Sequence, residues 1–122
     1  MQLTPHFDSW EFNSHDGATL PTAMRREYKE LCQLYLEPLR RRFGPVSITS
    51  GHRSALWNAR VGGAPESYHL WLPPREGVAA DVRCRRGRPA DWYAFLEGLA
   101  VGGLGAYGGF VHVDSRLTPA RW

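Results

Sequence analysis

Lysine, cysteine and long apolar runs are all scarce in this chain. Lys29 is the one lysine among 15 basic residues, so arginine carries nearly all of the positive charge. Cys32 and Cys84 are too few for a disulfide framework and form no Cys-x-x-Cys motif, so we expect buried, reduced thiols and no sulfur-ligated metal. No apolar run is long enough to cross a bilayer, and we expect no membrane partner.

The length and composition indicate one globular domain. A chain of 122 residues is too short for two ordinary domains, and 43% hydrophobic residues are enough for a core. We predict a single, monomeric domain over residues 1–122. Within it, residues 1–21 form an irregular arm that the aromatic side chains of Phe7, Trp10 and Phe12 anchor.

The charge pattern bears on the class of partner. The net charge is +3, and arginines cluster at residues 40–42 and 83–88. Such clusters attract polyanions, and an anionic cell wall is one of these. Aromatic residues do not interleave with the arginines, so we expect a solvated surface and no nucleic-acid partner.

The spacing of apolar residues predicts both helices and strands. Apolar residues three and four apart predict a helix over residues 22–43, which Gly44 and Pro45 end. A second helix is predicted over residues 89–99, and the glycine-dense stretch 102–109 is predicted to turn the chain into a last strand. Alternating apolar and polar residues predict three strands, over residues 46–50, 78–84 and 110–114.

Four side chains with metal-binding or acid–base chemistry lie in or close to these strands. His69 precedes the second strand, in which Asp81 is surrounded by apolar residues. His112 and Asp114 share one face of the last strand, because alternate residues of a strand point the same way. An ionised Asp81 in a core needs a partner, and either a metal or Arg53 would serve. The residues alone therefore indicate a candidate metal or acid–base site.

Several short motifs also follow one another in a distinctive order. They are Ser50-Gly51-His52-Arg53-Ser54, Ser67-Tyr68-His69, Ala79-Ala80-Asp81-Val82, Gly103-Leu104-Gly105, Phe110-Val111-His112-Val113-Asp114 and Arg121-Trp122. Together they resemble the zinc D-Ala-D-Ala carboxypeptidase family, peptidoglycan peptidases that share a fold with the hedgehog signalling domain. The resemblance implies an α+β fold in which a small antiparallel sheet with flanking helices carries a zinc site.

The resemblance also implies roles for individual residues. His69, Asp81 and His112 would be the ligands of one zinc ion per chain, with the fourth tetrahedral position left for water. Arg53 would act in catalysis by holding a carboxylate or carbonyl of the substrate, for which its planar fork is suited. The residues predicted to contact the substrate are Arg53, Ser67, Tyr107 and Trp122.

The chain departs from the family pattern in the spacing of the first two ligands. The family usually places the aspartate seven positions after the first histidine, whereas here Asp81 follows His69 by twelve. Five extra residues therefore lie between them, around residues 72–76. We interpret them as a lengthened hairpin tip that leaves the ligands in place and alters the substrate cleft.

A second departure concerns the general base. Many relatives carry an acidic residue three positions before the last ligand, where this chain has Gly109. We therefore predict Asp114 as the base, with an alternative role in orienting His112. Glu76 and His52 are the reserve candidates.

These residues predict hydrolysis of a peptide bond in peptidoglycan. The bond would lie in a stem peptide or cross-link, cut by a carboxypeptidase, an endopeptidase or an L-Ala-D-Glu endopeptidase. The N-terminus lacks a secretory signal, so we expect synthesis in a bacterial cytoplasm and action on the cell wall, as a phage endolysin or as part of a virion. The alternatives are a non-catalytic phage structural or binding module with the same fold and, less favoured, an arginine-rich nucleic-acid binder.

Overall fold

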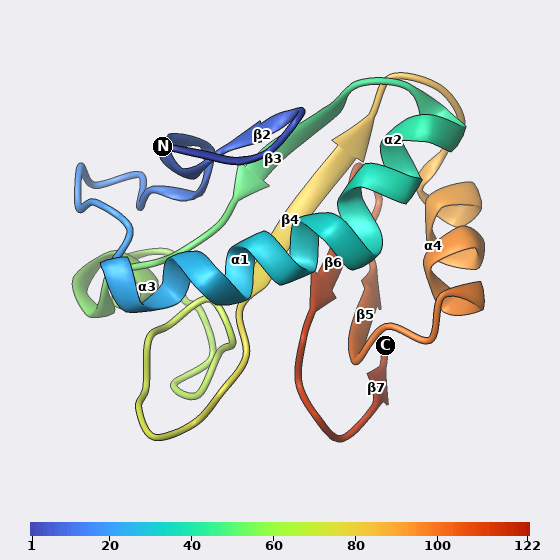
Figure 1. Ribbon diagram of the computed structural model, residues 1–122. Helices are drawn as coiled ribbons and strands as arrows, with labels where there is room; N and C mark the ends of the chain where they lie inside the picture. The colour runs from blue at the N-terminus through green and yellow to red at the C-terminus, as the bar shows by residue number, and fades with distance from the viewer.

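A five-stranded sheet forms the centre of the protein in the computed structural model, which describes all 122 residues. Its strands lie in the order β3, β4, β6, β5, β7, and every neighbouring pair is antiparallel except β5 and β7 (Figure 1). The α+β class with a small, mostly antiparallel sheet is thereby confirmed. The strands are β3 (Val46–Ser50), β4 (Ala79–Cys84), β5 (Gly103–Ala106), β6 (Val111–Asp114) and β7 (Ala120–Arg121).

The first predicted helix is present but is not uniformly α-helical. A 3-10 turn (Thr22–Met24) leads into α1 (Arg25–Leu31), a π-helical turn (Cys32–Leu36) and α2 (Glu37–Phe43). In the π turn the Glu37 N–H donates to the carbonyl of Cys32, five residues back. Pro38 follows directly, and a proline inside a helix has no N–H and crowds the preceding turn. The wider turn falls where the regular hydrogen-bond ladder is interrupted.

The helices cover one face of the sheet. Figure 1 shows α1 and α2 crossing that face, with α4 (Pro89–Gly98) alongside. No helix is long and apolar enough to span a membrane. The core between helices and sheet contains, among others, Leu31, Leu36, Leu96, Val82, Leu104, Val111 and Val113. The opposite face of β4 and β6 is left for polar side chains.

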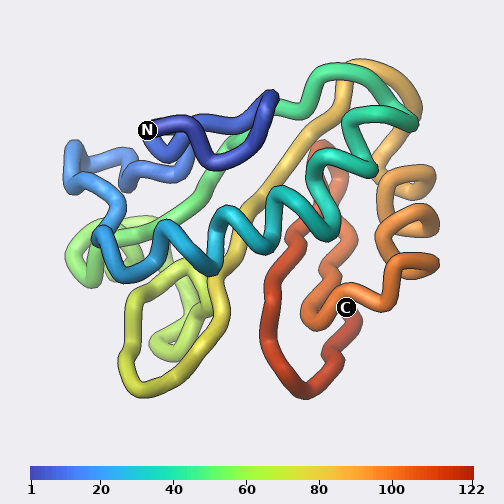
Figure 2. Tube along the Cα trace, in the orientation of Figure 1, coloured from blue at the N-terminus to red at the C-terminus, as the bar shows by residue number.

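A long irregular segment precedes β4. Helix α3 (Ala55–Arg60) is followed by residues 61–78, which form a long loop before β4 begins (Figure 2). The extra residues between His69 and Asp81 lie in this segment, where the structure has turns and no regular hairpin. The segment brings His69 to the polar face of the sheet.

The N-terminal arm is more regular than predicted. Residues Gln2–Thr4 (β1) and Phe7–Asp8 (β2) pair as two antiparallel strands, followed by a 3-10 helix over Ser9–Phe12. Asp8 caps this helix, and the Glu11 carboxylate accepts from the Asp8 N–H in return, which is a capping box. Phe7 and Phe12 lie in the core as predicted, whereas Trp10 is 70% exposed and anchors nothing.

The prediction of a turn for residues 102–109 is wrong at β5. Gly103–Ala106 form a strand hydrogen-bonded to both β6 and β7. Glycine is disfavoured in strands because it has no side chain to pack, and this preference led to the wrong prediction. In β5 the lack of a side chain is required. A Cβ on Gly103 would overlap the Asp114 carboxylate, and one on Gly105 would overlap the Trp122 ring.

Candidate metal centre

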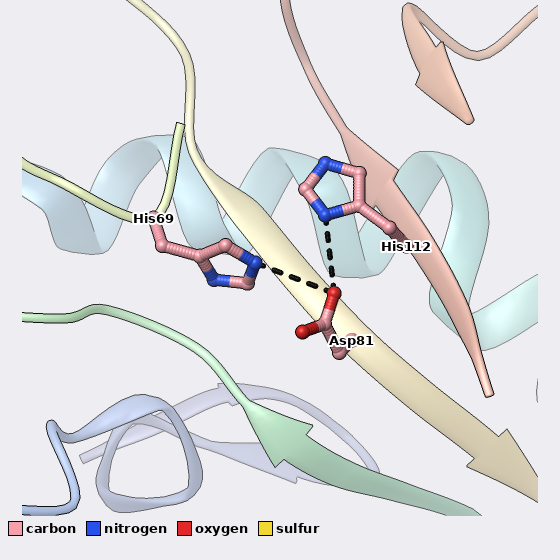
Figure 3. A group of neighbouring side chains, drawn as sticks. All are labelled: His69, Asp81 and His112. Atoms are coloured by element: carbon pink, nitrogen blue, oxygen red, sulfur yellow. Dashed lines mark hydrogen bonds and ion pairs between the residues drawn. The ribbon is translucent and has the colours of Figure 1, made fainter. Parts of the chain in front are cut away.

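The strand register places the three predicted ligands together. In the β4–β6 pair Asp81 lies directly opposite His112, so both side chains project from the polar face of the sheet. His69 comes from the irregular segment, where its carbonyl accepts from the Arg53 N–H at 2.8 Å. Figure 3 shows the two imidazole rings directed at the Asp81 carboxylate. Asp81, His69 and His112 are all buried.

The distances fit one small cation among the three side chains. His69 Nε2 lies 3.3 Å and His112 Nδ1 lies 3.1 Å from the same oxygen, Asp81 Oδ1. The potential ligand atoms of the three residues all lie within 4.8 Å of one another. Two nitrogens and one carboxylate oxygen are a donor set that zinc accepts, with a fourth tetrahedral position open for water or substrate.

The hydrogen bonds of the two histidines indicate which nitrogens are free to bind. His69 Nδ1 donates to the Gly51 carbonyl at 2.6 Å, and His112 Nε2 donates to Asp114 Oδ2 at 2.7 Å. With those protons assigned, the lone pairs of His69 Nε2 and His112 Nδ1 both face a carboxylate oxygen. His69 Nε2 has no hydrogen-bond partner although it is buried. A metal ion would satisfy the lone pairs of both nitrogens and of the Asp81 carboxylate, so the residues present fit this group.

The pKa values of the buried groups follow the same electrostatics. Burial raises the pKa of Asp81, but the neighbouring imidazoles of His112 and His69 outweigh burial and hold the pKa below its ordinary value. Burial lowers the pKa of His112, but Asp114 and Asp81 raise it above the usual histidine value. The surroundings of these side chains therefore favour a positive charge beside the carboxylates, as a bound metal ion would supply.

Asp114 lies on the same face as His112, as predicted, but is fully buried. Oδ2 accepts from His112 Nε2, and Arg116 donates to both carboxylate oxygens at 2.6–3.0 Å. Burial raises the pKa of Asp114, but hydrogen bonds from His112 and Arg116 hold it below the ordinary value. A carboxylate with both oxygens occupied in this way favours the orienting role over the role of a general base.

Arg53 lies directly beside the candidate ligands. Its Nη2 is 3.5 Å from Asp81 Oδ2, and its other nitrogens donate to Ser50 Oγ at 3.2 Å and Asn58 Oδ1 at 3.3 Å. A Cβ on Gly63 would overlap the Asn58 side chain and lie 3.0 Å from Arg53 Nη1, so glycine is needed there. The guanidinium is thus fixed at the site while 17% of its side chain stays exposed.

A cavity of about 890 Å³ opens onto this site. It is lined by all three candidate ligands and by all four residues predicted to contact substrate, Arg53, Ser67, Tyr107 and Trp122. The Trp122 indole N–H donates to the Tyr107 hydroxyl at 2.9 Å, and the Trp122 ring lies 5.0 Å from that of His112.

The reserve candidates for the base lie outside this cavity. Glu76 lines a separate hollow, and His52 is buried beside a neighbouring hollow of about 550 Å³. Sequence reasoning did not single out Glu66, Arg75 or Arg116, which do line the main cavity. No periodicity marks these residues, since two lie in an irregular segment and the third follows the last long strand.

Two imidazoles and a carboxylate at the wall of an open cavity are a donor set suited to a metal-dependent hydrolytic centre. The sequence model of the family Peptidase M15 matches residues 5–114, and the chain belongs to this family of metallopeptidases. The resemblance to the zinc D-Ala-D-Ala carboxypeptidases is thereby confirmed. Comparison with curated proteins and with solved structures gave no match.

Removal of a ligand should abolish stoichiometric metal binding. His69→Ala and Asp81→Ala each delete one of three donors, whereas His15→Ala removes an exposed histidine outside the site. We expect about one zinc per chain for the wild type and for His15→Ala, and substantially less for the other two after dialysis. Elemental analysis measures this, and full zinc content in both ligand variants would refute the assignment.

The glycine at position 103 should matter for the metal through Asp114. Gly103→Ala places a methyl group where the Asp114 carboxylate lies, so that carboxylate must move away from His112. We expect zinc affinity to fall about ten- to a hundredfold, the usual effect of losing such a partner. Gly109→Ala is the matched control, because nothing lies within 4 Å of a Cβ there. Equal zinc affinities of the two variants would contradict this assignment.

Proposed function

We propose that this metallopeptidase is a zinc enzyme that hydrolyses a peptide bond in bacterial peptidoglycan, in a stem peptide or a cross-link. The observation that carries the proposal is the convergence of two imidazole lone pairs on one buried carboxylate at the wall of the cavity. His69 Nε2, Asp81 and His112 Nδ1 would hold the ion. When bound, zinc supplies Lewis-acid activation of water and of the scissile carbonyl.

Arginine side chains in the cavity wall support a substrate that carries a carboxylate. Arg53 and Arg75 line the cavity together with Arg116, whose guanidinium is already paired with Asp114, while the carboxylates of the wall are Glu66 and the candidate ligand Asp81. Arginine forks bind carboxylates with two parallel hydrogen bonds, and peptidoglycan stem peptides carry free carboxylates. We assign Arg53 to orientation of a substrate carboxylate or carbonyl beside the metal, with Ser67, Tyr107 and Trp122 as further contacts.

A carboxylate is needed to accept a proton from water and return it to the leaving amine. The sequence predicts Asp114 for this role, but its contacts with His112 and Arg116 favour a role in orienting His112, so that Nδ1 would face the metal. Glu66 is the one carboxylate other than Asp81 in the cavity wall, and it is exposed. We therefore propose Glu66 as the proton acceptor and Asp114 as a positioning residue.

A cell-wall lysin is the setting that we propose for this activity, encoded by a phage and acting alone as a monomer or within a virion. The second candidate function is a non-catalytic phage structural or binding module. The observation that favours it is Gly109, which leaves the family's usual base position without an acid. Retention of three ligands and of Arg53 in one cavity favours the enzyme.

Digestion of purified peptidoglycan tests the proposal. The zinc-loaded protein should release new amino groups and soluble fragments, and mass analysis of these fragments should identify the bond that is cut. Chelation should stop the release and added zinc should restore it, because the metal activates both reactants. Zinc-loaded wild-type protein that releases no fragments and creates no new amines would contradict the enzyme and favour the binding module.

Amide substitution should lower the zinc affinity at Asp114 but the turnover rate at Glu66. Asp114→Asn should weaken zinc binding about ten- to a hundredfold, with activity recovering as zinc is added. Glu66→Gln should keep its zinc and lower the turnover rate by roughly two to four orders of magnitude, as loss of a general base does. Glu76→Gln is the matched control in a separate hollow and should behave as the wild type.

The experiment tests the role of Glu66 and the role of Asp114 separately. Wild-type turnover in Glu66→Gln would remove Glu66 from the mechanism. Low turnover in Asp114→Asn at saturating zinc would return the proton transfer to Asp114. Both quantities come from one titration of activity against added zinc.

A further inference from the structure

Arg116 lies just beyond β6 and donates hydrogen bonds to Asp114, the carboxylate that also accepts from the candidate ligand His112. Its Nη2 lies 2.6 Å from Asp114 Oδ2, and its Nε lies 2.9 Å and 3.0 Å from the two oxygens. The Arg116 backbone N–H donates to Oδ1 as well, at 3.0 Å. Because Asp114 is completely buried, this planar pair fixes both the position and the rotation of the carboxylate. That carboxylate in turn accepts a hydrogen bond from His112 Nε2.

The same guanidinium also contacts the segment that carries the other histidine. The Arg116 guanidinium carbon lies 4.4 Å from the centre of the Tyr68 ring, and that of Arg75 lies 3.9 Å from the same centre. Cations this close to an aromatic ring are attracted to its negative face. Tyr68 directly precedes His69, so its ring connects the end of β6 to the ligand-bearing loop.

Arg75 extends this set of contacts into the extra residues before β4. Its Nη1 donates to the Glu66 carbonyl at 2.6 Å, and its Nη2 donates to the carbonyls of Ser67 at 2.9 Å and Leu70 at 3.3 Å. The inserted segment is therefore tied back onto the loop on both sides of His69. A Cβ on Gly77 would lie 2.9 Å from the Tyr68 ring, so that glycine lets the chain pass close beside it.

We propose that Arg116 is a positioning residue of the metal centre that joins its two histidine ligands. On one side it holds Asp114, so that His112 presents Nδ1 to the metal. On the other it holds Tyr68, and with Arg75 it fixes the loop that presents His69. The inference deepens the proposed function and rests on it only for the presence of a metal. It also gives the extra residues between His69 and Asp81 a role, since Arg75 is among them.

The experiment measures zinc affinity by competition with a chromophoric chelator, and ligand geometry by the visible spectrum of the cobalt-substituted protein. Arg116→Gln should weaken zinc binding about ten- to a hundredfold and change the cobalt spectrum, because Asp114 loses its fixed orientation. Arg116→Lys should restore only part of the affinity, since one point charge cannot hold both oxygens. Arg26→Gln, an exposed arginine on α1, is the control for the loss of charge.

The pairing with Asp114 gives a test that a general loss of stability would not mimic. If Arg116 acts through Asp114, the double variant Asp114→Asn with Arg116→Gln should bind zinc hardly less tightly than Asp114→Asn alone. Wild-type affinity in Arg116→Gln, or losses that simply multiply in the double variant, would overturn the proposal.

Tyr68 provides a second arm that leaves Arg116 in place, in case Arg116→Gln does not fold. Tyr68→Phe keeps the ring and should keep the zinc affinity. Tyr68→Leu removes the ring that both Arg75 and Arg116 contact and should lower the affinity about three- to tenfold. Equal affinities of the two variants would contradict the link through Tyr68. Because the measured quantity is metal affinity, the absence of peptidoglycan cleavage would count against the proposed function and not against Arg116.

Discussion

The convergence of two unprotonated imidazole nitrogens on one buried carboxylate is the constraint on which this site depends. Each nitrogen faces Asp81 because the other nitrogen of the same ring donates a proton elsewhere, to the Gly51 carbonyl or to Asp114. Burial of an ionised aspartate is costly unless a positive charge lies beside it. A metal ion bound here would offset that cost, so that metal binding and folding stability are coupled.

The sheet provides the rigidity that such a site needs. Antiparallel pairing fixes Asp81 opposite His112, and strand β5 places Gly103 and Gly105 opposite Asp114 and His112. The absence of side chains at Gly103 and Gly105 leaves the space that the Asp114 carboxylate and the Trp122 ring occupy. The helices cover the other face, so the core and the site share the same strands without competing for side chains.

The sequence predicted the elements and the ligands better than the contacts among them. Strand alternation placed His112 and Asp114 on one face, and ordered motifs brought in His69 and Asp81. Strand β5 was missed because local propensity disfavours glycine in strands, whereas contacts from distant residues decide its conformation. The roles of Asp114 and Arg116 depend on which oxygen meets which nitrogen, and no spacing rule carries that information.

The most direct test of this account is anomalous diffraction at the zinc edge from crystals of the zinc-loaded protein. The account predicts one strong peak per chain, bounded by His69 Nε2, a carboxylate oxygen of Asp81 and His112 Nδ1, at about 2.0–2.2 Å from each. His112 Nε2 should remain on Asp114. A peak at other residues, or coordination through His112 Nε2 with Asp114 displaced, would contradict it.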